Sequence, residues 1–417
     1  MNLSHLFHHR LLPRFLLAGL LMGGMANQAF AQMDHSAHMG MMDKPNTCQG
    51  SGLECANAAT PFLTPDGRLY LAWTAGGVVS IAQSIDLGRT FNNPAQVAEH
   101  GKSLDARGDA RPQLVVNGQH IVLTYAFFKD KNWNAQINKV LSDDGGNTFS
   151  APVSIVADTS SQRFPSMLQT PDGKIFLSWI DKRIVNASKG TDHELLGGSI
   201  AYSFSNDGGV HFSPEKIANQ SSCECCRIAS ATDPRGGLAI AYRAIFPGGI
   251  RDHATQFVSE AESSGPIRRI SDDGWKTDVC PHQGPSIAIS SLGTFHVAWF
   301  TLGSKRQGVF YANSHNQGAS YSTPSRIGAT GQAISRPYLF ASGQHIWLVW
   351  KQFDGQMSAI YMRESLDDGR TWLKDRQLSQ TMGYSDHPLI IGDGQFVYLS
   401  WLTRAEGYQL IKIGAVR

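Results

Sequence analysis

Four sulfurs and an imidazole fall in two short segments of this chain. The first segment is Cys223-Glu224-Cys225-Cys226, and the second, about fifty residues later, is Cys280-Pro281-His282. Thiolates together with imidazole are ligands for soft or borderline metal ions such as Cu(I) and Zn(II). The spacing does not match a standard zinc finger or ribbon. These residues therefore predict a metal site, with copper preferred and zinc as the alternative, provided that the fold brings the two segments together.

The cysteines also support two other interpretations. In an oxidising compartment thiol pairs become disulfides, so Cys280 could pair with one of the three clustered cysteines. The clustered cysteines are poor partners for one another, because a disulfide between near-adjacent residues is strained. Thiol redox chemistry is the remaining alternative. Cys48 and Cys55 lie in a glycine-containing segment and are best explained as a local disulfide.

The N-terminus has the pattern of a secretory signal peptide. Arg10 and Arg14 precede an apolar stretch over 15–25, and Ala29-Phe30-Ala31 supplies the small-x-small pattern of a cleavage site. We expect cleavage after Ala31, so that residues 1–31 are removed and the protein is periplasmic or secreted. No later stretch reaches eighteen apolar residues, so no integral membrane span is expected.

Residues 32–57 form the next predicted segment, a flexible leader that ends with Cys48 and Cys55. Its first part is rich in methionine and histidine and resembles the Met/His segments of bacterial periplasmic copper-resistance proteins. Thioether and imidazole together favour copper over zinc. The alternative is a disordered tail without a ligand role. The weak additional metal ligands are His35, His38, Met39, Met41 and Met42.

Composition favours a large β-structured domain and excludes some partners. The 417 residues are 41% hydrophobic and 17% charged, which is enough to bury a large core, and 42 glycines and 18 prolines indicate many turns. The formal net charge is +2 without obvious charge runs. Nucleic acid and anionic membrane surfaces are therefore not expected as partners.

From residue 58 onward the sequence repeats with a period of about fifty residues, which is typical of a solenoid, array or propeller. Each repeat begins with a short β-like run, usually at a proline, and a second apolar run follows that ends in an aromatic residue. We predict an all-β fold, a seven-bladed β-propeller over 58–417, with six blades as the alternative. The seven aromatic residues are Trp73, Tyr125, Trp179, Tyr242, Trp299, Trp350 and Trp401.

A Ser-x-Asp-x-Gly-x-Thr-aromatic box follows the third run in several repeats. It is complete over 84–91, 142–149 and 365–372, and variants occur over 205–212 and 314–321. The short oxygen-bearing side chains satisfy turn N–H groups and the glycine supplies a positive φ. The boxes resemble the Asp-box (BNR) repeats of sialidase-like β-propellers. That resemblance implies a structural rather than catalytic role for Asp86, Asp144 and Asp367.

The first strand of each propeller blade lines the central channel, so equivalent offsets in neighbouring repeats should meet there. Cys226 and His282 each precede the start of their repeat by three positions, which predicts that they lie side by side at the channel mouth. The last repeat ends after three runs, so its fourth strand is either missing or supplied by residues before the first repeat. Further channel residues are predicted to be Arg111, Arg163, Arg227, Arg336 and His387.

The resemblance to sialidases also suggests a hydrolase. A sialidase holds the substrate carboxylate with three arginines and departs from the usual pair of catalytic carboxylates. Its first arginine lies in an Arg-Ile-Pro motif, for which the nearest match here is Arg163-Phe164-Pro165, in the third repeat, and the order of the later pieces does not fit. The weak catalytic candidates are Arg163, Arg243, Arg251 and Asp252, of which the arginines could instead bind a small anionic ligand.

The cysteine segments also resemble a pattern in an uncharacterised bacterial branch of sialidase-like propellers. That pattern comprises Cys225-Cys226-Arg227, Arg251-Asp252, Trp275-Lys276 and Cys280-Pro281-His282. We therefore expect an exported propeller that binds a metal ion through Cys and His side chains. The alternatives are an exo-α-sialidase-like glycoside hydrolase and a non-catalytic propeller that binds a glycan or a protein.

Overall fold

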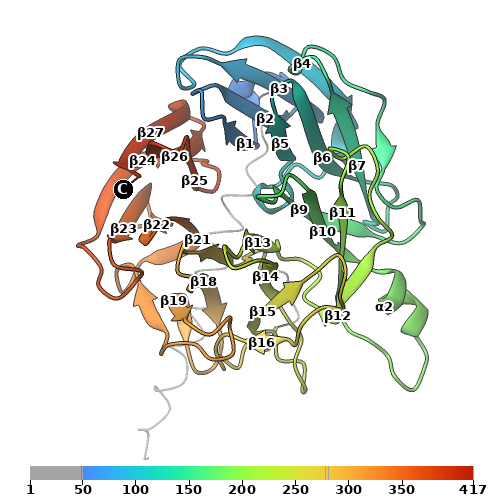
Figure 1. Cartoon of the computed structure of the whole chain (residues 1–417), viewed down its shortest axis with the longest axis vertical. Helices are drawn as coiled ribbons and strands as arrows, with labels where there is room; N and C mark the ends of the chain where they lie inside the picture. The colour runs from blue at the N-terminus through green and yellow to red at the C-terminus, as the bar shows by residue number, and fades with distance from the viewer. Residues whose placement is uncertain (1–47, 49, 278, 280, 417) are drawn as a thin grey trace, which may run out of the picture. The chain divides into compact units, whose positions relative to one another are not determined.

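A computed structural model gives the structure of the chain and describes residues 48, 50–277, 279 and 281–416. The described strands form seven small antiparallel sheets arranged in a ring, which is a seven-bladed β-propeller (Figure 1). The prediction of an all-β fold with seven blades is therefore confirmed, and the six-bladed alternative is wrong. In the described part of the chain, no helix is long and apolar enough to cross a membrane.

Several predicted features lie outside the described residues. These are the signal peptide over 1–31, the Met/His-rich part of the leader and one cysteine of the predicted metal site. The individual residues are His35, His38, Met39, Met41, Met42 and Cys280.

The first four sheets each contain four strands in sequential order. The first has β1 (Ala58–Leu63), β2 (Leu69–Ala75), β3 (Val78–Ser84) and β4 (Asn92–Glu99). The second has β5 (Gln113–Asn117), β6 (His120–Phe128), β7 (Ala135–Ser142) and β8 (Val153–Ser154). The third has β9 (Gln162–Gln169), β10 (Ile175–Asp181), β11 (Gly198–Ser205) and β12 (Lys216–Ser222). The fourth has β13 (Ala229–Thr232), β14 (Leu238–Arg243), β15 (His253–Val258) and β16 (Arg268–Arg269).

The remaining sheets complete the ring. The fifth has β17 (Ser286–Ile289), β18 (Phe295–Leu302), β19 (Gln307–Ser314) and β20 (Ser325–Ile327). The sixth has β21 (Ala333–Ser342), β22 (His345–Phe353), β23 (Met357–Ser365) and β24 (Arg376–Met382), and the seventh has β25 (Leu389–Gly392), β26 (Phe396–Thr403) and β27 (Gly407–Ala415). The described residues also form the short helices η1 (Leu53–Cys55), η2 (Gly101–Ser103), η3 (Gly108–Ala110) and α2 (Arg183–Ser188).

The aromatic residues that mark the repeats form the centres of the contacts between sheets. All seven lie on the second strand of their sheet and are at most 2% exposed. Trp179 on β10, for example, packs against Val115 and Val122 of the preceding sheet. Full burial of one large apolar side chain contributes roughly 1.5–3 kcal/mol, so this repeated contact is a major source of stability between neighbouring blades.

The boxes that follow the third strands are turns held by side-chain hydrogen bonds. Ser142 Oγ donates to Asp144 Oδ1 (2.8 Å) and accepts a hydrogen bond from the N–H of Gly146 (2.9 Å), whose φ is +91°. The N–H of Thr148 donates to the same aspartate oxygen (2.9 Å). Hydrogen bonds from Thr148 and Ser142 lower the pKa of Asp144 to about 2. Asp86 and Asp367 make the same contacts, so the predicted turn role is confirmed for these aspartates.

The seventh sheet has three strands among the described residues, and the described part of the segment before β1 supplies no fourth strand to it. The segment before β1 instead packs across the seam between the last and first sheets. Its predicted disulfide between Cys48 and Cys55 is present, and Cys55 is buried against Trp73 of β2 and Leu402 of β26. Arg404 Nη1 also donates to the carbonyl of Glu54 (3.2 Å).

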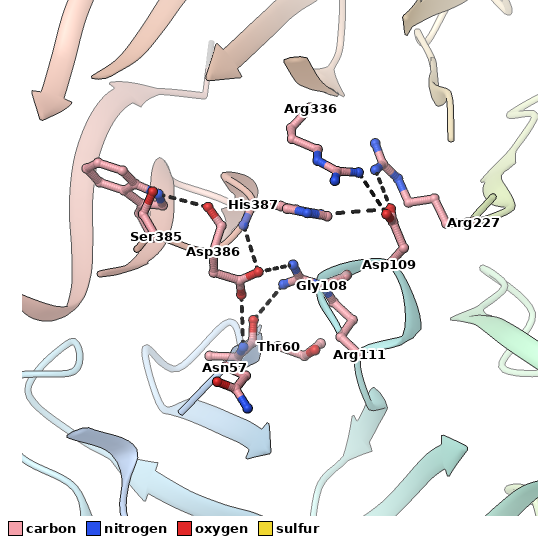
Figure 2. Close-up of polar contacts among 12 residues, drawn as sticks. Asn57, Thr60, Gly108, Asp109, Arg111, Arg227, Arg336, Ser385, Asp386 and His387 are labelled. Carbon is pink, nitrogen blue, oxygen red and sulfur yellow. Dashed lines mark hydrogen bonds and ion pairs between the residues drawn. The ribbon is translucent and has the colours of Figure 1, made fainter. Parts of the chain in front are cut away.

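Buried ion pairs on the channel side of the same seam connect the two ends of the ring (Figure 2). Arg111, which precedes β5, donates from Nη2 to Asp386 Oδ1 (2.7 Å) and from Nη1 to the carbonyl of Ala59 on β1 (2.7 Å). The other oxygen of Asp386, which precedes β25, accepts a hydrogen bond from the N–H of Ala59 (3.0 Å). One carboxylate and one guanidinium thus join the first, second and seventh sheets.

We expect Asp386→Asn to lower the free energy of unfolding by about 3–5 kcal/mol, because it leaves the buried Arg111 cation without its counter-charge. Urea denaturation followed by tryptophan fluorescence measures this difference. The control is Asp143→Asn, since Asp143 is 86% exposed and pairs only with His120 on the surface; it should change stability little. Equal effects of the two substitutions would contradict a special role for the buried pair.

Candidate functional site

The clustered cysteines lie in the connection between the third and fourth sheets. This connection runs from β12, the outermost strand of one sheet, to β13, the innermost strand of the next. Its start is fixed by the fourth sheet, because the N–H of Cys223 donates to the carbonyl of Arg243 (2.9 Å) and Ser222 forms a β-bridge with Ala244. The backbone therefore positions Cys223 at the end of β14.

The three sulfurs form a compact buried group. The Sγ atom of Cys223 lies 3.5 Å from that of Cys225 and 3.7 Å from that of Cys226, and all three sulfurs lie within 4.8 Å of one another. Each cysteine is at most 2% exposed. Two sulfurs that each bind one metal ion at about 2.3 Å are roughly 3.8 Å apart in tetrahedral geometry, so the observed distances suit shared coordination.

A buried cation accompanies the sulfurs. Arg243 is 1% exposed, and its guanidinium stacks 3.9 Å above the ring of Trp275. Its Nη2 donates to the carbonyl of Gln283 (2.9 Å), while Nε and Nη1 make no hydrogen bond within the described chain. Arg251 Nη1 lies 3.8 Å from the Sγ atom of Cys223. The sulfur cluster thus lies in an electropositive environment, which favours thiolates.

The protonation equilibria of the cluster follow from this environment. Hydrogen bonds from Cys225 and Cys226, together with the charge of Arg243, hold the pKa of Cys223 well below that of an ordinary thiol. The shared hydrogen bond with Cys223 and burial raise the pKa of Cys226. Burial and Arg243 lower the pKa of His253, which pairs with Arg243 across β14 and β15, so this imidazole stays neutral.

The structure does not place His282 with the sulfurs. Among the described residues, the group of three or more Cys, His, Asp or Glu ligand atoms that all lie within 4.8 Å of one another comprises the three cysteines and does not include His282. His282 has a left-handed backbone (φ +50°), and its ring lies 6.1 Å from that of Phe164. Burial lowers its pKa, and the nearby charges are those of Asp109, Arg163 and other arginines of the channel. His282 is therefore not a member of the three-sulfur group, and its predicted pairing with Cys226 stays a prediction.

Two of the weak catalytic candidates have structural partners. The guanidinium of Arg163 donates from Nε (2.5 Å) and Nη2 (3.1 Å) to the two carboxylate oxygens of Asp105. Asp252 is 1% exposed and accepts hydrogen bonds from the N–H groups of Asp273 (3.0 Å) and Trp275 (3.1 Å). The other two candidates, Arg243 and Arg251, lie at the sulfur cluster.

The central channel contains a second candidate site, a cavity of about 280 Å³ lined by residues that begin the inner strands of all seven sheets. The three clustered cysteines are not among its lining residues. Asp109 lies at its polar end and binds Arg227 Nη1 through Oδ1 (3.0 Å) and Arg336 Nη1 through Oδ2 (2.7 Å), as Figure 2 shows. Burial would raise the pKa of Asp109, but these two arginines lower it.

Of the predicted channel residues, Arg111, Arg227, Arg336 and His387 line this cavity and Arg163 does not. Sequence reasoning missed the acids Asp109 and Asp386, which pair with these arginines. A signal was available, because Asp109 precedes Pro112 by three positions and therefore has the same repeat offset as Cys226 and His282. Asp386 likewise precedes Pro388 by two positions, the offset of Arg227. No comparable signal exists for His253, which lies on a third strand.

Comparison with known proteins identifies the fold. No protein-family model and no curated protein sequence matches this chain. It is similar to an ulvan lyase of polysaccharide lyase family PL25 solved with GlcA(1-4)Rha3S, with a TM-score of 0.56 and 11% identity over 88% of this chain and 97% of the lyase. The polysaccharide lyase Uly1 gives a TM-score of 0.53 and 11% identity over 87% and 90% of the two chains. At such identities the likeness shows the seven-bladed propeller fold.

The burial of the sulfurs predicts slow reaction of Cys223 and Cys226 with iodoacetamide in the native protein, because a thiol must be accessible to be alkylated. Mass spectrometry of peptides after timed alkylation measures the modified fraction at each cysteine. Protein unfolded in urea is the reference and should be modified completely under reducing conditions. Complete modification of the native protein within minutes would contradict the observed burial.

Proposed function

We propose that this protein binds a soft metal ion, copper(I) in preference to zinc, through the thiolates of Cys223, Cys225 and Cys226. The observation that carries the proposal is the approach of three buried sulfurs to within 4.8 Å of one another. Thiolate ligands select soft ions such as Cu(I), and the Cys-x-Cys-Cys spacing differs from that of standard zinc modules. The role is metal handling, for which no catalytic step is required.

Other features of the sequence support an exported copper-binding protein. The signal peptide over 1–31 supports a periplasmic or secreted location, where the Met/His-rich part of the leader would supply further ligands for copper. The box turns support membership of the Asp-box propellers, in a branch that carries the two cysteine segments. The sialidase-like alternative has less support, because the guanidinium of Arg163 is already paired with the carboxylate of Asp105.

A second function, the binding of a sugar in the central channel, is favoured by a separate observation. The channel holds a cavity of about 280 Å³ with polar side chains from several sheets along its wall. Two solved structures of this fold are polysaccharide lyases, one of them with a bound saccharide. We therefore propose that the channel also binds a glycan, independently of the metal centre.

Metal analysis of protein purified without oxygen tests the copper proposal. Wild-type protein loaded with Cu(I) should retain about one copper ion per chain after gel filtration, measured by inductively coupled plasma mass spectrometry. Cys226→Ser should lose it, because one of the three thiolates is removed. His282→Ala should retain it, since the imidazole lies outside the cluster.

The controls separate metal binding from folding. The double substitution Cys48→Ser and Cys55→Ser removes the local disulfide and should leave the copper content unchanged. Retention of zinc in place of copper would overturn the copper preference. Metal-free wild-type protein with oxidised Cys223 and Cys226 would overturn the metal centre altogether.

Arg243→Gln should weaken Cu(I) binding by roughly tenfold to a hundredfold, because it removes a buried positive charge beside the anionic sulfurs. Competition with a chromogenic Cu(I) chelator measures the dissociation constant. The matched control is Arg363→Gln, since Arg363 also lies over a tryptophan ring, that of Trp350 (5.8 Å). Unchanged copper affinity of the Arg243 variant would contradict an electrostatic role for this residue.

A further inference from the structure

Buried charges at the polar end of the channel do not balance. Six charged side chains at most 17% exposed act on one another there, and four of them are cations while two are acids. The neighbouring pair of Arg163 and Asp105 adds no net charge. Among the described residues, this group therefore carries an excess of two positive charges. Its members are Arg111, Arg227, Arg336, Lys351, Asp109 and Asp386.

The hydrogen bonds show where the excess lies. Asp386 is paired with Arg111, whereas Asp109 divides its two oxygens between Arg227 and Arg336. Lys351 Nζ donates to the carbonyl of Ser385 (2.9 Å), which carries no charge to compensate it. The group thus has two carboxylates to compensate four cations. Water is largely excluded from it because its side chains are mostly buried.

The same excess affects the protonation of neighbouring groups. Burial and the charge of Arg336 lower the pKa of Lys351 to about 8. Burial and the surrounding arginines also lower the pKa of His387 far below its ordinary value, so the imidazole is neutral and has both a donor and an acceptor nitrogen. Each shift has the sign that a positive local potential produces.

The cavity gives an anion access to this potential. Arg227, Arg336 and His387 line it together with apolar residues such as Pro61 and Leu389. At about 280 Å³ the cavity is smaller than the roughly 300–1,000 Å³ pockets of drug-sized ligands, so it suits a compact molecule. Arg227, with a side chain 17% exposed, is the most accessible guanidinium of those that bind Asp109.

We propose that the channel binds a monosaccharide-sized molecule that carries an oxyanion, which compensates the excess charge beside Arg227 and Arg336 and accepts a hydrogen bond from His387. The inference rests on the proposed sugar-binding function of the channel and adds the charge class of the ligand. Carboxylate, sulfate and phosphate share the geometry that a guanidinium recognises. The sulfur cluster takes no part in this site.

Isothermal titration calorimetry at low ionic strength tests the proposal with glucuronate, glucose 6-sulfate, glucose 6-phosphate, glucose and inorganic sulfate. Binding of at least one charged sugar, at least tenfold tighter than glucose and inorganic sulfate, is the expected result. Equal binding of glucose and the charged sugars would contradict the proposed preference for an oxyanion but would agree with the sugar-binding function. Binding of inorganic sulfate as tight as that of the charged sugars would overturn the sugar-binding function. Absence of all binding would overturn both.

Variants locate the site within the chain. Arg227→Gln should weaken binding of the charged sugar at least tenfold, and Arg227→Lys should restore part of it. Lys351→Met removes one excess charge without lining the cavity and should weaken binding roughly tenfold. Arg235→Gln is the control, because Arg235 forms a similar pair with the buried Asp233 outside the channel. An equal loss of affinity in the Arg235 control would overturn the assignment of the site to the channel. Unchanged affinity in both the Arg227 and Lys351 variants, with thermal melting like that of the wild type, would also overturn it.

Discussion

The ion pair between Arg111 and Asp386 joins the two ends of a ring that has no covalent closure. A propeller whose last sheet has three strands in the described chain lacks the strand exchange that would join its first and last blades through backbone hydrogen bonds. The pair supplies a substitute, because both side chains also bind the backbone of Ala59. The disulfide-bonded segment that ends at Cys55 covers the same seam farther from the channel.

This arrangement has an electrostatic consequence for the channel. Asp386 pairs with Arg111 at the seam, and Asp109 is the acid among the described residues that pairs with both Arg227 and Arg336. Buried cations thus connect the blades, and the described part of the chain has fewer acids than cations in this group. A ligand that brings its own negative charge would complete the network, which relates the stability of the ring to the occupancy of its channel.

The sulfur cluster follows a different principle, because it lies in a connection rather than on paired strands. Repeat spacing correctly located the inner strands that begin at Ala229 and Ser286, yet Cys226 and His282 precede both strands. Outside a strand, sequence offset no longer determines the direction of a side chain, and the backbone of His282 is left-handed rather than extended. The sulfurs are instead oriented by the end of β14 and lie beside Arg243, a residue that the offset rule could not associate with them.

The sequence by itself determined the seven repeats, the aromatic residues between sheets, the aspartates of the turns and the disulfide of Cys48 and Cys55. These features depend on local spacing and on burial patterns that every repeat shares. Only the tertiary structure grouped the sulfurs of Cys223, Cys225 and Cys226 and added Asp109 and Asp386 to the predicted arginines of the channel. The physical reason is that charge compensation and ligand geometry depend on side chains from several blades, whose distances are fixed only when the ring has closed.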